Sequence, residues 1–145
     1  MSKIKIGCAA DHAGYECKEY IKRFLSDQGY EIQDFGTHSL DSMDYPDVIH
    51  PLAKLIDKGE IDLGFIFCGS GNGVNITANK YNKVRSALCW TPEVASLAKQ
   101  HNNANCVAIP ARFVSQETAA EIVTAFMNAE FEGGRHQNRV DKIAC

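Results

Sequence analysis

The chain has 145 residues, a formal net charge of −3 and 45% hydrophobic residues. A chain of this length can bury a sizeable core, and we predict one domain over residues 1–145. It has no basic run that would indicate a nucleic-acid partner and no apolar stretch long enough to span a bilayer. We also expect a cytoplasmic protein with reduced thiols, because the N-terminus enters a strand pattern directly and the six cysteines form no CxxC pair.

The first third of the chain predicts strand, helix and strand. Residues 3–10 and 30–35 have the pattern of strands, and Gly29 stands where a glycine commonly ends a helix. The helix between the strands has apolar residues at helical spacing, namely Cys17, Tyr20, Ile21, Phe24 and Leu25.

A polar loop over residues 36–45 leads to the second predicted helix. This helix opens at Tyr45-Pro46-Asp47 and carries apolar residues as far as Ile56. Pro51 lacks the N–H that a helix interior needs, so we expect either a helix that starts at Pro51 or a kink before it.

Residues 62–68 form an almost unbroken apolar run, which is typical of a central strand buried on both faces of a parallel sheet. Cys68 ends this run, and a turn with glycines at alternate positions follows it. A short helix is predicted over residues 74–80. The thiol would then lie near a helix N-terminus, which favours the thiolate.

The rest of the chain continues the alternation. Strands are predicted over residues 84–88 and 105–109, and residues 129–145 form a polar C-terminal tail with a helical turn after Gly133-Gly134. Thr91-Pro92-Glu93 and Ser115 mark the starts of two further helices. We therefore predict an α/β fold: a three-layer α/β/α Rossmann-like arrangement around a five-stranded parallel sheet.

Polar residues follow several of the predicted strands, at the edge where open α/β sheets bind ligands. Asp11 and His12 follow the first strand, Cys68 the third and Arg112 the fifth. Each has a plain alternative: Asp11 as a helix cap, His12 as a loop imidazole and Cys68 as a packing residue before a tight crossover. The turn after Cys68 lacks the Lys of a P-loop and the third glycine of a dinucleotide fingerprint.

Two further pairs lie in the second half of the chain. His101 and Asn102 end a helix. A cationic histidine and an asparagine both favour the C-terminal end of a helix, so the pair could be purely structural. Arg135 and Arg139 share a face if the tail is helical, and two guanidinium groups on one face suit a phosphate. The alternative for this pair is a solvated tail.

Six segments occur together and in order, and they resemble the type B ribose-5-phosphate isomerases of the ribose/galactose isomerase family. They are Ala10-Asp11-His12-Ala13-Gly14, Asp44-Tyr45-Pro46-Asp47, Cys68-Gly69-Ser70-Gly71-Asn72-Gly73, Ala78-Asn79-Lys80, His101-Asn102 and Gly133-Gly134-Arg135-His136-Gln137-Asn138-Arg139-Val140. The resemblance covers nearly the whole chain. It implies interconversion of D-ribose 5-phosphate and D-ribulose 5-phosphate in the pentose phosphate pathway, without a metal or other cofactor.

The resemblance also assigns catalytic roles. Cys68 would move a proton between C2 and C1 through a cis-enediolate, because family members with this Cys use it as the base and Val74 leaves no Glu after the loop. Ser70, where many members carry Thr, would stabilise the enediolate with the loop amides. His101 would open the sugar ring.

The remaining assignments concern binding of the substrate. Arg135 and Arg139 resemble the family's phosphate clamp, and Asp11 and Asn102 would hold sugar hydroxyl groups. The other expected substrate contacts are His12, Tyr45, Gly69, Gly71, Asn72, Gly73 and Arg112.

Other functions stay open at this point. A six-carbon substrate, allose or galactose 6-phosphate, is one alternative, although the galactose branch lacks the His-Asn pair and the paired arginines. A non-enzymatic phosphate-binding α/β module would need the glycine loop but no thiol. A thiol-redox enzyme would want a second cysteine close to Cys68, and none is near in sequence.

Chain geometry, together with the ring-opening role that the resemblance gives His101, predicts that the active site is shared between subunits. Cys68 ends a strand, whereas His101 ends a helix of about ten residues, about 15 Å long, that runs back to the other edge. We therefore expect a homodimer with shared active sites, or a dimer of dimers. We expect no metal site, because no cluster of His, Asp and Glu with ligand spacing stands out in the sequence.

Overall fold

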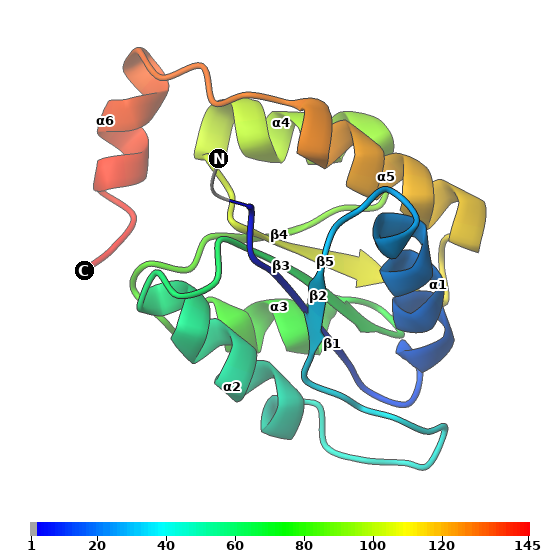
Figure 1. The fold of residues 1–145 in the computed structure, drawn as a ribbon. Helices are drawn as coiled ribbons and strands as arrows, with labels where there is room; N and C mark the ends of the chain where they lie inside the picture. Colours follow the sequence, from blue (N-terminus) through cyan, green and yellow to red (C-terminus); the bar gives the residue numbers. More distant parts are fainter. Residues whose placement is uncertain (1–2) are drawn as a thin grey trace.

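The computed structural model describes residues 3–145, and at its centre is a five-stranded sheet (Figure 1). All the strand pairs are parallel, and the strand order is β2-β1-β3-β5-β4. The strands are β1 (Ile6–Ala10), β2 (Ile32–Asp34), β3 (Leu63–Cys68), β4 (Ser86–Leu88) and β5 (Cys106–Pro110). The predicted Rossmann-like α/β class and the five-stranded parallel sheet are confirmed.

Helices cover both faces of the sheet. They are α1 (Tyr15–Ser26), α2 (Pro46–Asp57), α3 (Asn72–Ala78), α4 (Pro92–Asn102), α5 (Gln116–Asn128) and α6 (Arg135–Asp141). One core cluster joins α1, α4 and α5 to the sheet, and a second joins α2 and α3 to the opposite face. The short helix α6 lies beyond the end of α4, away from both layers (Figure 1).

Strand β3 lies in the middle of the sheet and is buried on both faces. Phe65 and Phe67 belong to one core cluster, whereas Ile66 and Cys68 belong to the other. This division follows from the strand itself, because successive side chains point to opposite faces. The apolar run in the sequence therefore identified the central strand.

Several element boundaries differ from the predictions. Helix α2 runs without a break through Pro51, so the expectation that it starts at Pro51 is wrong. Pro51 has no N–H to donate to the carbonyl of Asp47, one turn earlier in the helix. Both residues are exposed, so water can donate to that carbonyl instead. Strands β1 and β2 are shorter than predicted, and α3 begins two residues earlier, at Asn72.

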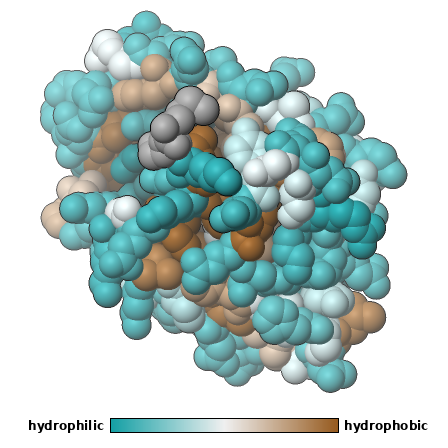
Figure 2. Space-filling model, viewed as in Figure 1, coloured by the Kyte–Doolittle hydropathy of each residue, from teal (hydrophilic) through white to brown (hydrophobic). Residues whose placement is uncertain are grey.

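The surface in this view is mainly hydrophilic, with hydrophobic patches between polar side chains (Figure 2). Cys145 is exposed, and the other five cysteines are buried. Within residues 3–145, no helix combines the length and the apolar character needed to cross a membrane.

A buried ion cluster, which the sequence did not reveal, ties α1 to β2. The Lys18 side chain is fully buried, and its Nζ lies 2.6 Å from Asp34 Oδ2, which Lys22 Nζ also approaches at 2.8 Å. Burial alone would raise the pKa of Asp34. The hydrogen bonds from Lys18, Lys22 and the Gly36 N–H outweigh that effect and lower the pKa to about 2.

We predict that Asp34→Ala lowers the free energy of unfolding by about 3 kcal/mol, because it leaves the Lys18 ammonium group buried without its main partner. The pKa of Asp34 is lower in the folded state, so this stabilisation is present above about pH 4 and is lost as the pH falls towards 2. Urea unfolding at neutral pH and near pH 3 measures both effects. Asp27→Ala, at an exposed aspartate after the same helix, is the control. Equal stability of the two variants at neutral pH would contradict the prediction.

Candidate functional site

The turn after β3 points a backbone N–H group at a buried thiol. Cys68 is 5% exposed, and its Sγ accepts a hydrogen bond from the Gly71 N–H at 3.1 Å. Ser70 lies on the outer side of the turn, exposed, with its Oγ accepting the Asn72 N–H at 3.2 Å. A thiol, a hydroxyl group and several amides are thus gathered within one turn at the carboxyl edge of the sheet.

Two side chains from other segments are packed against the glycines of this turn. A Cβ on Gly69 would lie 3.1 Å from the Arg112 guanidinium Nη1, and a Cβ on Gly73 would lie 2.5 Å from Cζ of the Tyr45 ring. The Arg112 N–H also donates to the Gly69 carbonyl at 3.0 Å. The alternating glycines therefore allow Arg112 and Tyr45 to lie directly against the backbone near the thiol.

Asp11 and His12 join this edge from β1. Asp11 is buried, its N–H donates to the Phe67 carbonyl at 3.2 Å, and its Oδ1 accepts the Gly14 N–H at 3.0 Å. The carboxylate thus closes the turn before α1. The Nδ1 atom of His12 accepts the Met43 N–H at 3.3 Å, which brings the loop before α2 over the site.

The buried cysteines elsewhere serve as packing residues. Burial raises the pKa of four thiols, Cys8, Cys17, Cys89 and Cys106, to about 12, so they stay protonated at neutral pH. None of them ends a strand beside a glycine turn, as Cys68 does.

His101 and Asn102 lie at the opposite, amino edge of the sheet. They end α4, and Arg85, just before β4, donates from its Nε to the Asn102 carbonyl at 3.2 Å. In Figure 1 the end of α4 and all of α6 lie on the left, whereas the strands β3 and β5 end on the right. The predicted separation of His101 from Cys68 within one chain is therefore confirmed.

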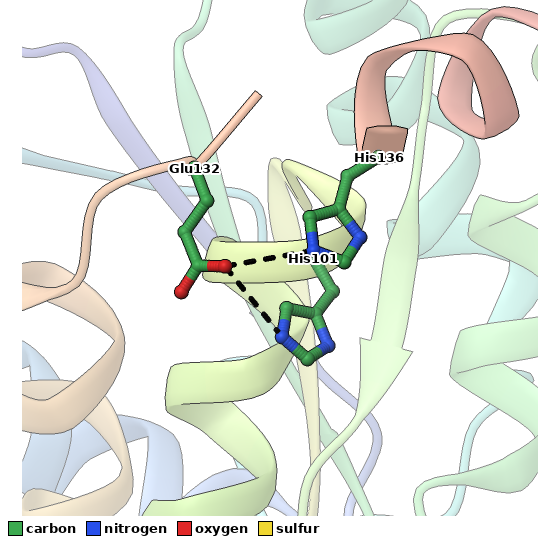
Figure 3. Close-up of side chains that lie close together, drawn as sticks. All are labelled: His101, Glu132 and His136. Atoms are coloured by element: carbon green, nitrogen blue, oxygen red, sulfur yellow. Dashed lines mark ion pairs between the residues drawn. The ribbon is translucent and has the colours of Figure 1, made fainter. Parts of the chain in front are cut away.

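His101 belongs to a cluster that the sequence did not indicate. Its ring stacks on that of His136 with the centroids 4.3 Å apart, and Glu132 Oε1 lies 3.9 Å from His101 Nε2 and 3.5 Å from His136 Nε2 (Figure 3). The sequence shows no cluster of His, Asp and Glu, but the fold brings these three residues together. Linear spacing could not show it, because the three residues come from α4, the connection after α5, and α6.

Local structure explains the state of this cluster. The Glu132 N–H donates to the Gln100 carbonyl at 3.0 Å, which holds the connection against the end of α4. Burial lowers the pKa of His136, and the nearby side chains of His101, Arg135 and Arg139 act in the same direction. Glu132 opposes this effect. His136 is therefore neutral near pH 7.

Arg135 and Arg139 lie one turn apart on α6, as predicted, and both are exposed. Among residues 3–145, neither arginine takes part in an ion pair. They lie with His101 at the amino edge, so one chain does not bring them to Cys68. The phosphate clamp stays a prediction.

A cavity of about 980 Å³ lies elsewhere, at the amino ends of β1 and β2. It is lined by residues 3–6, 28–33 and 60–61, and none of the predicted site residues borders it. Cavity size alone would thus point away from the residues that can carry chemistry.

Comparison with known proteins adds the family context. The model of the Ribose/Galactose Isomerase family matches residues 6–143. Ribose-5-phosphate isomerase B of Escherichia coli is 42% identical over 145 residues, covering 100% of this chain and 96% of that protein.

Solved structures agree with that likeness. A ribose 5-phosphate isomerase from Thermotoga maritima superposes with a TM-score of 0.95 at 43% identity, over 99% of both chains. Ribose-5-phosphate isomerase B from Mycoplasma genitalium with bound ribulose-5-phosphate gives a TM-score of 0.94 at 39% identity, over 99% of this chain and 95% of that one.

We predict that Gly71→Ala destabilises the protein more than Gly29→Ala does. Both glycines have positive φ, 77° and 93°, so both substitutions incur backbone strain of about 1–2 kcal/mol. Only at Gly71 would the new Cβ also meet Leu88 Cδ1 at 2.5 Å, whereas nothing lies within 4 Å at Gly29. The clash should add about 1–3 kcal/mol in urea unfolding. Equal losses in the two variants would show that the turn can move to make room.

Proposed function

The chain belongs to the ribose/galactose isomerase family, and from that premise we propose that it interconverts D-ribose 5-phosphate and D-ribulose 5-phosphate. The observation that carries the proposal is the Cys68 thiol in its turn of backbone amides, at the ligand edge of a chain similar throughout to such isomerases. Residues 1–145 would act as a single isomerase domain.

The proposed chemistry moves one proton between adjacent carbons. Cys68, as thiolate, takes the proton from C2, and the electron pair left behind forms the enediolate. The resulting thiol then returns a proton to C1, while a proton passes from the C2 oxygen to the C1 oxygen. The Gly71 N–H donates to Sγ and fixes the position of the sulfur in the turn.

The enediolate oxygens carry the charge that develops during the reaction. The exposed Ser70 hydroxyl and the amides of the loop over residues 69–73 lie on the same turn as the thiol. Donors fixed in place before the reaction stabilise such charge without reorganising. Asp11 and Tyr45, beside the turn, would bind sugar hydroxyl groups.

Ring opening and phosphate binding need the residues of the amino edge. His101 would pass a proton between the ring oxygen and the anomeric hydroxyl group, with Asn102 binding a sugar hydroxyl. Arg135 and Arg139 present two guanidinium groups that no carboxylate neutralises among residues 3–145. Arg112 and His12 would contact the phosphate from the carboxyl edge.

A homodimer can join these two sets of residues. In a two-fold pair, the carboxyl edge of one chain faces the amino edge of its partner, and the same contact recurs at the second site. Large apolar side chains exposed on one chain support such a pairing: Ile76 is 61% exposed, Trp90 54% and Phe113 74%. Trp90 and Phe113 follow strands β4 and β5, close to the proposed site. A dimer of dimers would leave this pairing unchanged.

The pentose substrate is favoured over its alternatives. The resemblance indicates that the galactose branch lacks the His101–Asn102 pair and the paired arginines, and this chain has both. A phosphate-binding module without activity would have no use for the thiol. The free cysteines suit the reducing cytoplasm, where we propose that the protein acts.

We predict that Cys68→Ala lowers turnover of ribose 5-phosphate by about 10³-fold, because the proton-transferring base is lost. Exchange of the C2 proton with solvent should disappear as well, while circular dichroism stays unchanged. Cys89→Ala, at a fully buried packing cysteine, should keep its turnover. Wild-type activity in Cys68→Ala would refute the assignment of the base. Faster conversion of allose 6-phosphate by the wild type would refute the pentose preference.

We further predict that two inactive variants complement each other. Cys68→Ala and His101→Ala, unfolded and refolded together, form mixed dimers with one intact site. Half of the dimers are mixed at statistical assembly, so about a quarter of wild-type activity should return.

The control for complementation mixes variants of the same edge. Cys68→Ala with Ser70→Ala cannot rebuild a site, so activity should not exceed what Ser70→Ala retains. If Cys68→Ala and His101→Ala form mixed dimers by mass spectrometry and stay inactive, the shared site is disproved.

A further inference from the structure

Three side chains with metal-binding groups converge at the amino edge of the sheet, where no metal role has been assigned. They are His101 at the end of α4, Glu132 in the connection before α6, and His136 in α6. Their ligand atoms all lie within 4.8 Å of one another. In Figure 3 the Glu132 carboxylate points towards both imidazole rings.

The spacing of these atoms is close to that of a zinc ligand set. Ligand atoms about 2.0–2.2 Å from a tetrahedral zinc ion lie about 3.3–3.6 Å apart. The Oε1 atom of Glu132 lies 3.5 Å from His136 Nε2 and 3.9 Å from His101 Nε2. The two stacked rings would have to turn towards each other, so that their lone pairs point at one ion next to the Glu132 carboxylate.

The same distances argue against direct bonds within the cluster. Contacts of 3.5 and 3.9 Å exceed the usual length of an N–H···O hydrogen bond. The carboxylate oxygen thus faces two nitrogens with which it makes no short contact. The backbone nevertheless fixes the group, because the Glu132 N–H donates to Gln100 and the His136 N–H to Gly133.

The ligand chemistry selects the kind of metal. Two imidazoles and one carboxylate with an open fourth position suit Zn²⁺ and the related divalent transition ions, whereas Mg²⁺ and Ca²⁺ prefer oxygen ligands. Arg135 and Arg139 stand beside His136 on α6. Their charges disfavour a dication, so binding should be weaker than at a structural zinc site.

We propose that His101, Glu132 and His136 bind one zinc-type divalent ion per chain, and that the bound ion inhibits ring opening by occupying the imidazole of His101. The inhibitory effect rests on the proposed function, whereas binding of the metal does not. The ion is an inhibitor here and no part of the reaction itself.

Binding is tested with Co²⁺ and Zn²⁺ on protein freed of metal by a chelator. Cys145→Ser serves as the background, because Cys145 is an exposed thiol outside the proposed sites. Calorimetry with Zn²⁺ should give one ion per chain, and Co²⁺ should give the visible absorption of a nitrogen and oxygen site. Glu132→Gln and His136→Gln should each weaken binding at least tenfold.

The matched control is His38→Gln. His38 is also paired with a carboxylate, with its Nδ1 atom 4.0 Å from Asp34 Oδ2, but it lies outside the cluster. Its substitution should leave the affinity unchanged. Glu132 is exposed, so Glu132→Gln should fold normally even if His136→Gln does not. Full affinity in folded Glu132→Gln, or a strong sulfur-to-cobalt band in the ultraviolet, would overturn the site.

The inhibitory effect is tested separately with ribose 5-phosphate. Chelator-treated enzyme should be fully active, Zn²⁺ should inhibit it, and added chelator should restore activity. Glu132→Gln should need at least tenfold more Zn²⁺ for the same inhibition. Equal inhibition of both proteins would overturn the effect on His101. If the proposed function is wrong, the enzyme will show no activity even before zinc is added. The metal-binding results would not change in that case.

Discussion

The polarity of the parallel sheet is the constraint on which the rest of this structure depends. Every strand pair is parallel, so the strands all end along one edge and each helix between them returns the chain to the other. Cys68 ends a strand, whereas His101 lies at the end of a helix, so the thiol and the imidazole are held at opposite edges. A chemistry that needs both groups must draw them from two chains.

Packing around the carboxyl edge prepares the turn at Cys68. The Asp34 carboxylate, held by Lys18, also accepts the Gly36 N–H at the start of the loop over residues 36–45. That loop carries Met43, which donates its N–H to His12, and it ends beside Tyr45, which lies against Gly73. A buried ion pair thus connects to the site through one loop. Val74, after the glycine turn, is fully buried, and a carboxylate there would have to be desolvated.

At the amino edge, one imidazole faces competing demands. Ring opening needs His101 free to exchange a proton, but the stacked ring of His136 limits where the His101 ring can lie. Fixing the ring favours catalysis through orientation. The same arrangement gathers ligand atoms closely enough to hold an ion. Precise positioning of a histidine beside a carboxylate therefore carries a susceptibility to metals.

The sequence by itself determined the alternation of strands and helices, the buried central strand, the caps at Thr91 and Ser115, and the glycine turn after Cys68. These features depend on local periodicity and on residues close in sequence, which a linear pattern records. It also placed Cys68 and His101 at different edges, because that follows from chain direction alone.

Only the tertiary structure decided the strand order, the burial of Lys18 against Asp34, the passage of α2 through Pro51, and the grouping of His101 with Glu132 and His136. Each of these except Pro51 joins residues that are distant in the chain. At Pro51, solvent exposure decided the outcome. Such contacts depend on how whole elements pack, and packing can bury a lysine or assemble three ligands without leaving any period in the sequence.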